Sequence, residues 1–355
     1  MKQILKAALL VGAVCGLCVQ TPVLAAQARK AESTTAKKPG KSVAKAAPKA
    51  ASKALPGKTA AGKSGKVAAG NTANGPTRKV AAAAKPAGKP VRAALEMDGD
   101  PRRLALYSAS ALVIDQSTGQ PLVEKQPDAV VPIASISKLM TAMVVLDAKL
   151  DLQEVISIGE EDVDGLKGTR SRLPVGTTMT RETAMLLAMM SSENRAAHAL
   201  GRHYPGGMPA FVQAMNKKAH ALGMYNSRFE EPTGLSSNNV STAHDLARMV
   251  AAAARYPEIR QYSTTAEAKV ELNGRIRDFG NTNALVRSDN WEIGVSKTGY
   301  ISEAGRCLVM QARVADKPVV IVLLDSVGKM TRVGDANRIK RWMESASLAS
   351  DRRKT

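Results

Sequence analysis

The chain contains 355 residues with a formal net charge of +20 and three cysteines. Beyond residues 1–28, no apolar run approaches the roughly 18 residues that a membrane-spanning helix needs, which excludes a multi-span membrane protein. Only one cysteine, Cys307, lies outside that segment, so an internal disulfide is also excluded. Cys307 opens an apolar run, and we expect it to be a buried strand residue and not a nucleophile.

Residues 1–28 predict an export signal. Lys2 and Lys6 precede an apolar run at 7–19, and small residues at 25–28 offer cleavage points. The run is too short to span a bilayer, so we expect a cleaved signal peptide. The mature protein would then be periplasmic, and soluble or peripherally associated with the membrane.

Residues 29–95 predict a disordered, basic linker. Residues 29–92 hold sixteen lysines and arginines and one acid, Glu32, among mostly small and polar residues. Such a composition cannot bury enough apolar surface to offset the entropy of ordering. Its charge suits anionic polymers of the cell wall or an anionic membrane surface, whereas the export signal argues against nucleic acid as a partner. A solvated spacer with no specific partner is an equal alternative.

Residues 96–348 predict one folded domain, followed by a polar tail at 349–355. A strand at 109–115 and a returning segment that ends at 123 indicate a hairpin. Helices are expected at 135–150, 181–200, 208–222, 242–254 and 335–343, and late strands near 291–298, 306–314 and 318–325. Strands at both ends with helices between them predict an α+β fold in which helices cover an antiparallel sheet.

The segment Ser135-Ile136-Ser137-Lys138 opens the first predicted helix. Residues three apart share a helix face, so the spacing places the Lys138 amine beside the Ser135 hydroxyl. A serine hydroxyl needs a base, and a lysine can serve when burial or a neighbouring cation lowers its pKa. The same spacing recurs at 42–45 and 326–329. The first of these lies in the linker and the second among turn residues, so only Ser135 has a suitable setting.

Two further triplets favour a catalytic role for Lys138 over the alternative interpretation, an ordinary surface lysine on an amphipathic helix. Ser192-Glu193-Asn194 follows an apolar helical run, and Lys297-Thr298-Gly299 ends a predicted strand. A cation, a hydroxyl and a glycine there would let a substrate backbone lie along the strand edge while the lysine holds a carboxylate. The three triplets, separated by 57 and 105 residues, occur in the order typical of serine β-lactamases and penicillin-binding proteins.

Longer segments at 132–142, 190–197, 231–235, 241–243 and 297–300 extend these triplets. Together they resemble the low-molecular-weight penicillin-binding proteins, which are D-alanyl-D-alanine carboxypeptidases and endopeptidases. Glu193 and the residues 289–291 make the chain most similar to the endopeptidase branch. The resemblance implies one β-lactamase-like or DD-peptidase-like domain that needs no cofactor and no metal. It also implies peptidoglycan peptides as substrates and β-lactams as covalent inhibitors.

The resemblance implies roles for the first two triplets. Ser135 would attack the carbonyl of the penultimate D-alanine, and Lys138 would accept the hydroxyl proton. Ser192 would relay a proton to the leaving amine. Asn194 would orient Lys138 and the substrate amide.

The third triplet would bind substrate. Lys297 would hold the carboxylate of the residue being released, with Thr298 and Gly299 beside it on the strand. The backbone N–H groups of Ser135 and Tyr300 would form the oxyanion hole. Water would then hydrolyse the resulting ester.

Several functions stay open from the sequence. Trimming of a terminal D-alanine and cleavage of the D-alanyl cross-link share one catalytic centre and differ in the room beyond the scissile bond. A β-lactamase would need a glutamate to activate the deacylating water, for example in a Glu-x-x-Leu-Asn setting, and neither Glu230 nor Glu231 has that setting. A metallopeptidase is disfavoured because the four histidines lack metal-ligand spacing. A non-catalytic wall-binding protein, acting through the basic linker, is the remaining alternative.

Overall fold

The computed structural model describes residues 104–351, with side chains described to residue 348. The predicted export signal and basic linker lie outside these residues, as do residues 352–355 of the predicted polar tail. Within the described part of the chain, no helix is both long enough and apolar enough to cross a lipid bilayer.

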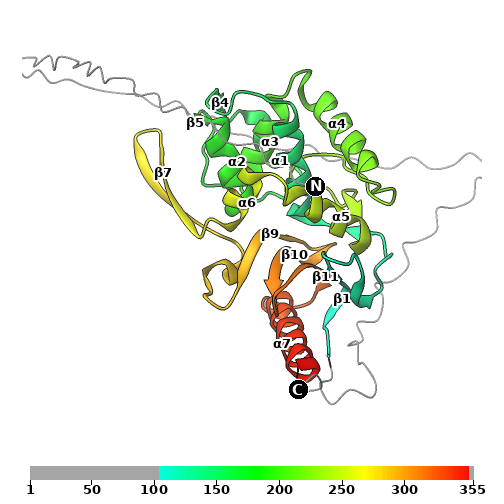
Figure 1. Cartoon of the computed structure of the whole chain (residues 1–355). Helices are drawn as coiled ribbons and strands as arrows, with labels where there is room; N and C mark the ends of the chain where they lie inside the picture. The colour runs from blue at the N-terminus through cyan, green and yellow to red at the C-terminus, as the bar shows by residue number, and fades with distance from the viewer. Residues whose placement is uncertain (1–103, 352–355) are drawn as a thin grey trace, which may run out of the picture. The chain divides into compact units, whose positions relative to one another are not determined.

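A five-stranded antiparallel sheet forms the centre of the described domain (Figure 1). Its order is β2-β1-β11-β10-β9, so the first and last strands of the domain pair with each other. The predicted hairpin and the three predicted late strands are confirmed. The strands are β1 (Ser108–Asp115), β2 (Pro121–Lys125), β9 (Glu292–Ile301), β10 (Gly305–Val314) and β11 (Lys317–Ser326).

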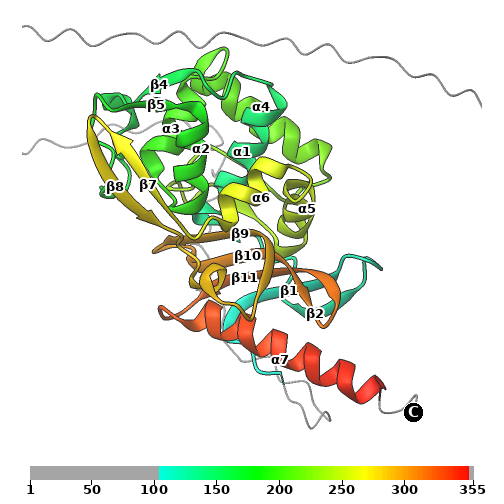
Figure 2. The same cartoon turned by 60° about the vertical axis from the view of Figure 1, so that its left-hand side comes forward.

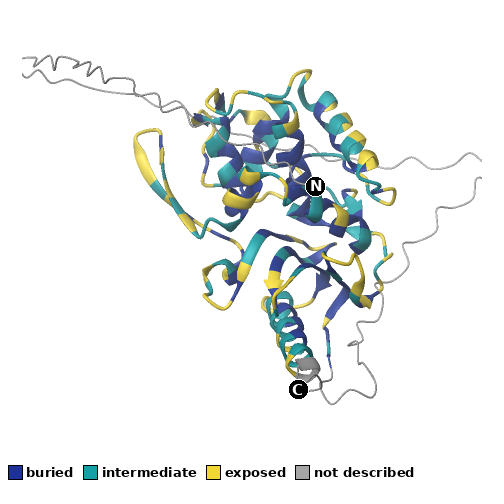
Figure 3. Cartoon of the chain, viewed as in Figure 1, coloured by how far each residue is buried: buried dark blue, intermediate teal, exposed yellow. Residues whose placement is uncertain are grey.

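Both faces of the sheet are buried, as Figure 3 shows for its central strands. On β11, Val320, Val322 and Leu324 belong to the core beneath the main group of helices. The alternate residues of the same strand belong to a second core, which helix α7 (Thr331–Asp351) covers with Ala336 and Ile339. Because successive strand side chains point to opposite faces, a strand buried on both sides must be apolar at nearly every position.

The main group of helices lies on the face opposite α7 (Figures 1 and 2). Helix α5 packs directly on β1, β10 and β11, helix α6 packs on β9, and the remaining helices pack mainly on one another. The helices are α1 (Lys138–Asp147), α2 (Arg181–Met190), α3 (Asn194–Arg202), α4 (Gly207–Ala221), α5 (Ala243–Ala253) and α6 (Pro257–Thr264). Two short antiparallel strand pairs accompany the helices. In the first, β3 (Val131–Pro132) pairs with β6 (Val240–Ser241), and in the second, β4 (Val155–Ser157) pairs with β5 (Thr178–Thr180). The predicted α+β class is therefore confirmed.

Several elements differ from the sequence prediction, and helix α6 and the two short strand pairs were not predicted. The helix expected at 181–200 is two helices, α2 and α3, which are separated by a break at 191–193. Helix α7 is longer than expected at both ends and includes residues 349–351 of the predicted polar tail. A hairpin of β7 (Glu267–Leu272) and β8 (Arg275–Gly280), not predicted from the sequence, lies along the side of the helices (Figure 2).

Candidate active site

The segment that carries Ser135 is a short 3₁₀ turn, where the first turn of an α-helix was expected. The turn comprises Ala134–Ser137, and helix α1 begins at Lys138. Ala134 has a φ of +49°, in the left-handed region, and its carbonyl oxygen accepts a hydrogen bond of 2.9 Å from Ser137 Oγ. Such strained backbone concentrates at functional sites. The turn leaves Ser135 partly exposed while Lys138 is fully buried.

The Lys138 amine has three close oxygen neighbours. Its Nζ lies 2.9 Å from Ser135 Oγ, 2.7 Å from Asn194 Oδ1 and 2.6 Å from the Thr233 carbonyl oxygen. Burial lowers the pKa of Lys138 to about 7, although the negative charges of Glu231 and Glu193 oppose this shift. The amine is therefore neutral in a large fraction of molecules near neutral pH, and a neutral amine can accept a proton from Ser135.

The break between α2 and α3 places Ser192 and Asn194 in the same site. Ser192 has a left-handed φ of +61°, which no helix interior tolerates, so α2 ends before it. Asn194 is the first residue of α3, and its Nδ2 donates to Thr169 Oγ1 at 3.0 Å. Because this contact takes the amide nitrogen, the amide oxygen of Asn194 faces Lys138.

Lys297 reaches the site from β9, at the edge of the sheet. Its Nζ donates to Ser192 Oγ at 3.0 Å and to the Thr298 carbonyl oxygen at 3.0 Å. The pKa of Lys297 is lowered, first by burial and then by the charges of Lys138 and Arg332. A bound anion would offset both effects and favour the protonated amine.

Gly299 brings the end of β9 against the nucleophile turn. A Cβ on Gly299 would lie 2.9 Å from the Ile133 carbonyl oxygen and 3.1 Å from the Ser135 backbone nitrogen, too close for any side chain. Thr298 Oγ1 donates to Thr282 Oγ1 at 2.7 Å. Tyr300 follows on the strand with its side chain 57% exposed.

All eight predicted site residues therefore lie in or beside one cluster. The geometry adds two groups that sequence reasoning missed. The Thr233 carbonyl contacts Lys138, and Arg332 from the start of α7 donates to the Gly299 carbonyl oxygen at 3.0 Å. Thr233 lies in the segment 231–235 that marks the family resemblance, so its place in the sequence was a signal. Nothing in the sequence around Arg332 singled it out.

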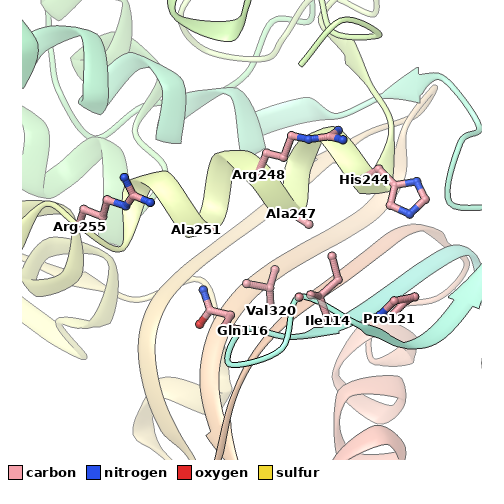
Figure 4. Close-up of a pocket in the computed structure, with 10 residues that line it drawn as sticks. Ile114, Gln116, Pro121, His244, Ala247, Arg248, Ala251, Arg255 and Val320 are labelled. Atoms are coloured by element: carbon pink, nitrogen blue, oxygen red, sulfur yellow. The ribbon is translucent and has the colours of Figure 1, made fainter. Parts of the chain in front are cut away.

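A large cavity lies elsewhere in the domain. It has a volume of about 550 Å³ and lies between α5 and the β1–β2 hairpin (Figure 4). Ala247 and Ala251 of α5 face Ile114, Pro121 and the neighbouring strand across it. It contains none of the predicted site residues, so its size does not identify the catalytic centre.

The histidines and Cys307 have ordinary structural surroundings. His198 Nδ1 lies 2.7 Å from Asp162 Oδ1, and His244 Nδ1 lies 2.8 Å from Asp128 Oδ1. Across residues 104–351, no three His, Cys, Asp or Glu side chains are grouped as metal ligands would be. Cys307 is fully buried, as predicted, and burial raises the pKa of its thiol to about 11, which leaves it unreactive.

Comparison with known proteins adds an independent finding. Residues 97–328 match the model of the D-alanyl-D-alanine carboxypeptidase family. A D-alanyl-D-alanine endopeptidase of Pseudomonas aeruginosa is 49% identical over 271 residues, covering 76% of this chain and 86% of that protein. A D-alanyl-D-alanine endopeptidase of Escherichia coli is 48% identical over 245 residues, covering 68% of this chain and 79% of that protein.

A solved structure shows the same fold. The crystal structure of the Streptomyces K15 DD-transpeptidase matches with a TM-score of 0.63 and 27% sequence identity, over 68% of this chain and 98% of that one.

Proposed function

The chain belongs to the D-alanyl-D-alanine carboxypeptidase family, and we propose that it is a serine DD-peptidase that cleaves D-alanyl bonds of peptidoglycan through an ester on Ser135. One observation carries the proposal: the buried Lys138 amine, whose pKa is lowered to about 7, lies 2.9 Å from Ser135 Oγ. A hydroxyl nucleophile with a base of this pKa at hydrogen-bond distance is suited to acyl transfer near neutral pH.

In the acylation step, Ser135 Oγ attacks the carbonyl carbon of the penultimate D-alanine and its proton passes to neutral Lys138. The carbonyl oxygen gains the electron pair, and the backbone N–H groups of Ser135 and Tyr300 stabilise it. Gly299 supports this assignment, because it brings the backbone that precedes Tyr300 close to the Ser135 nitrogen. The tetrahedral intermediate then collapses, the peptide C–N bond breaks and the ester forms.

The leaving amine needs a proton as that bond breaks. Ser192 Oγ lies 3.0 Å from Lys297 Nζ, and we assign it the role of a relay: it gives its hydroxyl proton to the leaving nitrogen and recovers one from protonated Lys138, which becomes neutral again. Lys297, flanked by Thr298, binds the carboxylate of the departing residue. This carboxylate supplies the negative charge that the surroundings of the Lys297 amine lack. A water molecule then adds to the ester carbonyl and gives a proton to neutral Lys138, which passes it to Ser135 Oγ as the ester C–O bond breaks and the acid departs.

We propose the D-alanyl cross-link as the preferred bond, which makes the enzyme an endopeptidase. The relatives from Pseudomonas aeruginosa and Escherichia coli that bear the name endopeptidase support this choice. The family description favours a second candidate, removal of a terminal D-alanine. Comparing hydrolysis of a cross-linked dimeric muropeptide with that of a linear pentapeptide separates the two. If terminal D-alanine were released from the linear peptide faster than the cross-linked dimer is cleaved, the assigned activity would be carboxypeptidase and not endopeptidase.

Glu231 lies near the site, and its contacts do not support a β-lactamase. Both carboxylate oxygens accept short hydrogen bonds within the turn at 231–236, including those from the backbone N–H groups of Thr233 and Gly234 at 2.6 Å. Because both oxygens are occupied by these contacts within the turn, the carboxylate is not directed at a deacylating water. A stable acyl-enzyme with penicillin is therefore expected.

The basic linker extends the proposal to the cell envelope. Its sixteen cationic residues, together with the predicted export signal, favour a periplasmic enzyme held near anionic wall or membrane components. Protein that lacks residues 29–92 should be retained less on isolated cell walls at low salt, with unchanged turnover of a short soluble peptide. Unchanged retention would reduce the linker to a spacer.

The central experiment uses purified mature protein and its Ser135→Ala variant. Each is incubated with a fluorescent penicillin and examined by denaturing gel and intact mass. We expect covalent labelling of the parent and none of the variant, because the acyl group is attached to Ser135. Equal labelling of both would place the nucleophile elsewhere, and a folded, unlabelled parent would contradict the DD-peptidase function.

A further inference from the structure

The Lys138 amine has a fixed set of hydrogen-bond partners. A neutral amine offers two N–H donors and one lone pair, whereas the Asn194 amide oxygen and the Thr233 carbonyl oxygen can only accept. These two oxygens lie 2.7 and 2.6 Å from Nζ and take both donors. The lone pair is then left for the third neighbour, Ser135 Oγ. Loss of either acceptor would allow the amine to rotate and aim its lone pair away from the hydroxyl.

The Thr233 carbonyl belongs to a turn that one carboxylate organises. Glu231 Oε2 accepts from the Thr233 backbone N–H at 2.6 Å and from its hydroxyl at 2.5 Å. Glu231 Oε1 accepts from the backbone N–H groups of Gly234 at 2.6 Å and Ser236 at 3.3 Å. Hydrogen bonds to a charged acceptor are stronger than neutral ones, so this side chain fixes the backbone on both sides of the carbonyl.

The same turn is pressed against the nucleophile segment. Gly234 has a φ of +82°, and a Cβ there would lie 1.9 Å from the Ala134 carbonyl oxygen. Thr141 Oγ1 on α1 donates to the Pro232 carbonyl oxygen at 2.7 Å. Displacement of the turn would therefore be felt at both Lys138 and the residue before Ser135.

A buried asparagine completes the connection. Asn239, which is 0% exposed, donates through Nδ2 to the Glu231 carbonyl oxygen at 2.8 Å and lies 3.0 Å from Ser137 Oγ. Ser137 lies between Ser135 and Lys138 in the sequence. The backbone of Glu231 is thus tied to the catalytic segment, while its carboxylate holds the part of the turn that carries the Thr233 carbonyl.

We propose that Glu231 is a positioning residue for the catalytic lysine, because its carboxylate holds the Thr233 carbonyl where it aims the Lys138 lone pair at Ser135. This inference rests on the proposed roles of Ser135 and Lys138. The Glu231 charge has a second consequence: it raises the pKa of Lys138 against the larger lowering by burial. Its removal should therefore change both the geometry and the titration of the base.

Glu230 provides a matched control. It is the preceding glutamate, but it accepts from Ser236 Oγ and Asn238 Nδ2, both at 3.0 Å, and forms an ion pair with Arg228 at 3.1 Å. None of these contacts fixes the Thr233 carbonyl. Glu230→Gln therefore removes one charge and leaves the arrangement around Lys138 intact.

The test measures acylation by a fluorescent penicillin from about pH 5.5 to 9 for the parent, Glu231→Gln, Thr233→Val and Glu230→Gln. Rates are taken per folded molecule, with folding checked by thermal unfolding. We expect Glu231→Gln to lower the high-pH plateau on the order of 10- to 100-fold, the scale of a misplaced catalytic group. Its rising limb should move to lower pH, because the Lys138 pKa falls when a nearby negative charge is lost. Thr233→Val, which removes the hydroxyl contact, should lower the plateau less, and Glu230→Gln should match the parent.

Three results would overturn the proposal. The first is a high-pH acylation rate in Glu231→Gln equal to that of the parent. If only the pH at which the rate rises were shifted, Glu231 would act through its charge alone and not by positioning Lys138. The second is an equal loss in Glu230→Gln, which would point to general electrostatics. If Glu231→Gln does not fold, the test rests on Thr233→Val. The third overturning result is a high-pH acylation rate in Thr233→Val equal to that of the parent. A folded parent that penicillin fails to label at any pH would instead contradict the proposed function itself.

Discussion

Lys138 on α1 and Lys297 on β9 are both almost completely buried, at 0% and 1% exposed, and burial lowers the pKa of each amine. Their surroundings differ. Lys138 contacts two oxygens that can only accept, and nearby glutamates partly restore its pKa. Lys297 contacts a hydroxyl and a neighbouring carbonyl, and the charges of Lys138 and Arg332 lower its pKa further.

This difference separates two tasks that one residue type performs in one site. The acceptors around Lys138 fix the direction of its lone pair, and a pKa of about 7 keeps a neutral fraction available, as a base requires. The surroundings of Lys297 are short of negative charge, so an arriving carboxylate improves them. Substitution of each lysine by methionine tests the division, because methionine keeps an unbranched apolar side chain in the buried space.

The largest effect is expected for Lys138→Met. Among residues 104–348, Lys138 is the side chain at hydrogen-bond distance from Ser135 Oγ. Without its amine, acylation by a fluorescent penicillin should fall about 10²- to 10⁴-fold, the usual contribution of a general base. The loss should appear equally with a charged penicillin and with its methyl ester. Retention of more than a tenth of the parent rate in the folded variant would assign the base to another residue.

A smaller and more selective effect is expected for Lys297→Met. A hydrogen bond to a charged group contributes about 1.5–3 kcal/mol, so acylation by a penicillin with a free carboxylate should fall roughly 10- to 150-fold. The methyl ester lacks the anion, and its rate should change much less. An equal loss with both compounds would indicate that Lys297 acts mainly through Ser192 in proton transfer, and the proposed division between the lysines would then be wrong.

The sequence predicted the nucleophile segment well because residue spacing on a helix determines it. The separation of Ser135 and Lys138 brings the two side chains together in the 3₁₀ turn as it would in an α-helix. The break at Ser192 was not predicted, because residues 191–193 include neither glycine nor proline. The left-handed φ of Ser192 is imposed by its tertiary surroundings.

The β7–β8 hairpin and Thr233 are contrasting omissions. Asn273 and Gly274 both have positive φ, and an Asn-Gly pair between alternating residues is the strongest local signal of a hairpin, so this element could have been predicted. Thr233 acts through its backbone carbonyl, which every residue possesses. Side-chain chemistry therefore gave no indication that this carbonyl would contact Lys138.

The pH dependence of acylation sharpens the comparison further, with an effect of about tenfold for each pH unit below the pKa of the base. Protonated Lys138 cannot accept the Ser135 proton, so the rate should rise with pH through about 7 and level off above it, because burial lowers the Lys138 pKa to that value. An unperturbed lysine would place the limb near pH 10. The measurement is the second-order acylation rate of the parent with the methyl ester, which removes the contribution of carboxylate binding at Lys297. A rate that rises only near pH 10 would mean that the Lys138 amine reacts from a solvated environment. Burial, the property that Lys138 and Lys297 share, would then not control the pH dependence of catalysis.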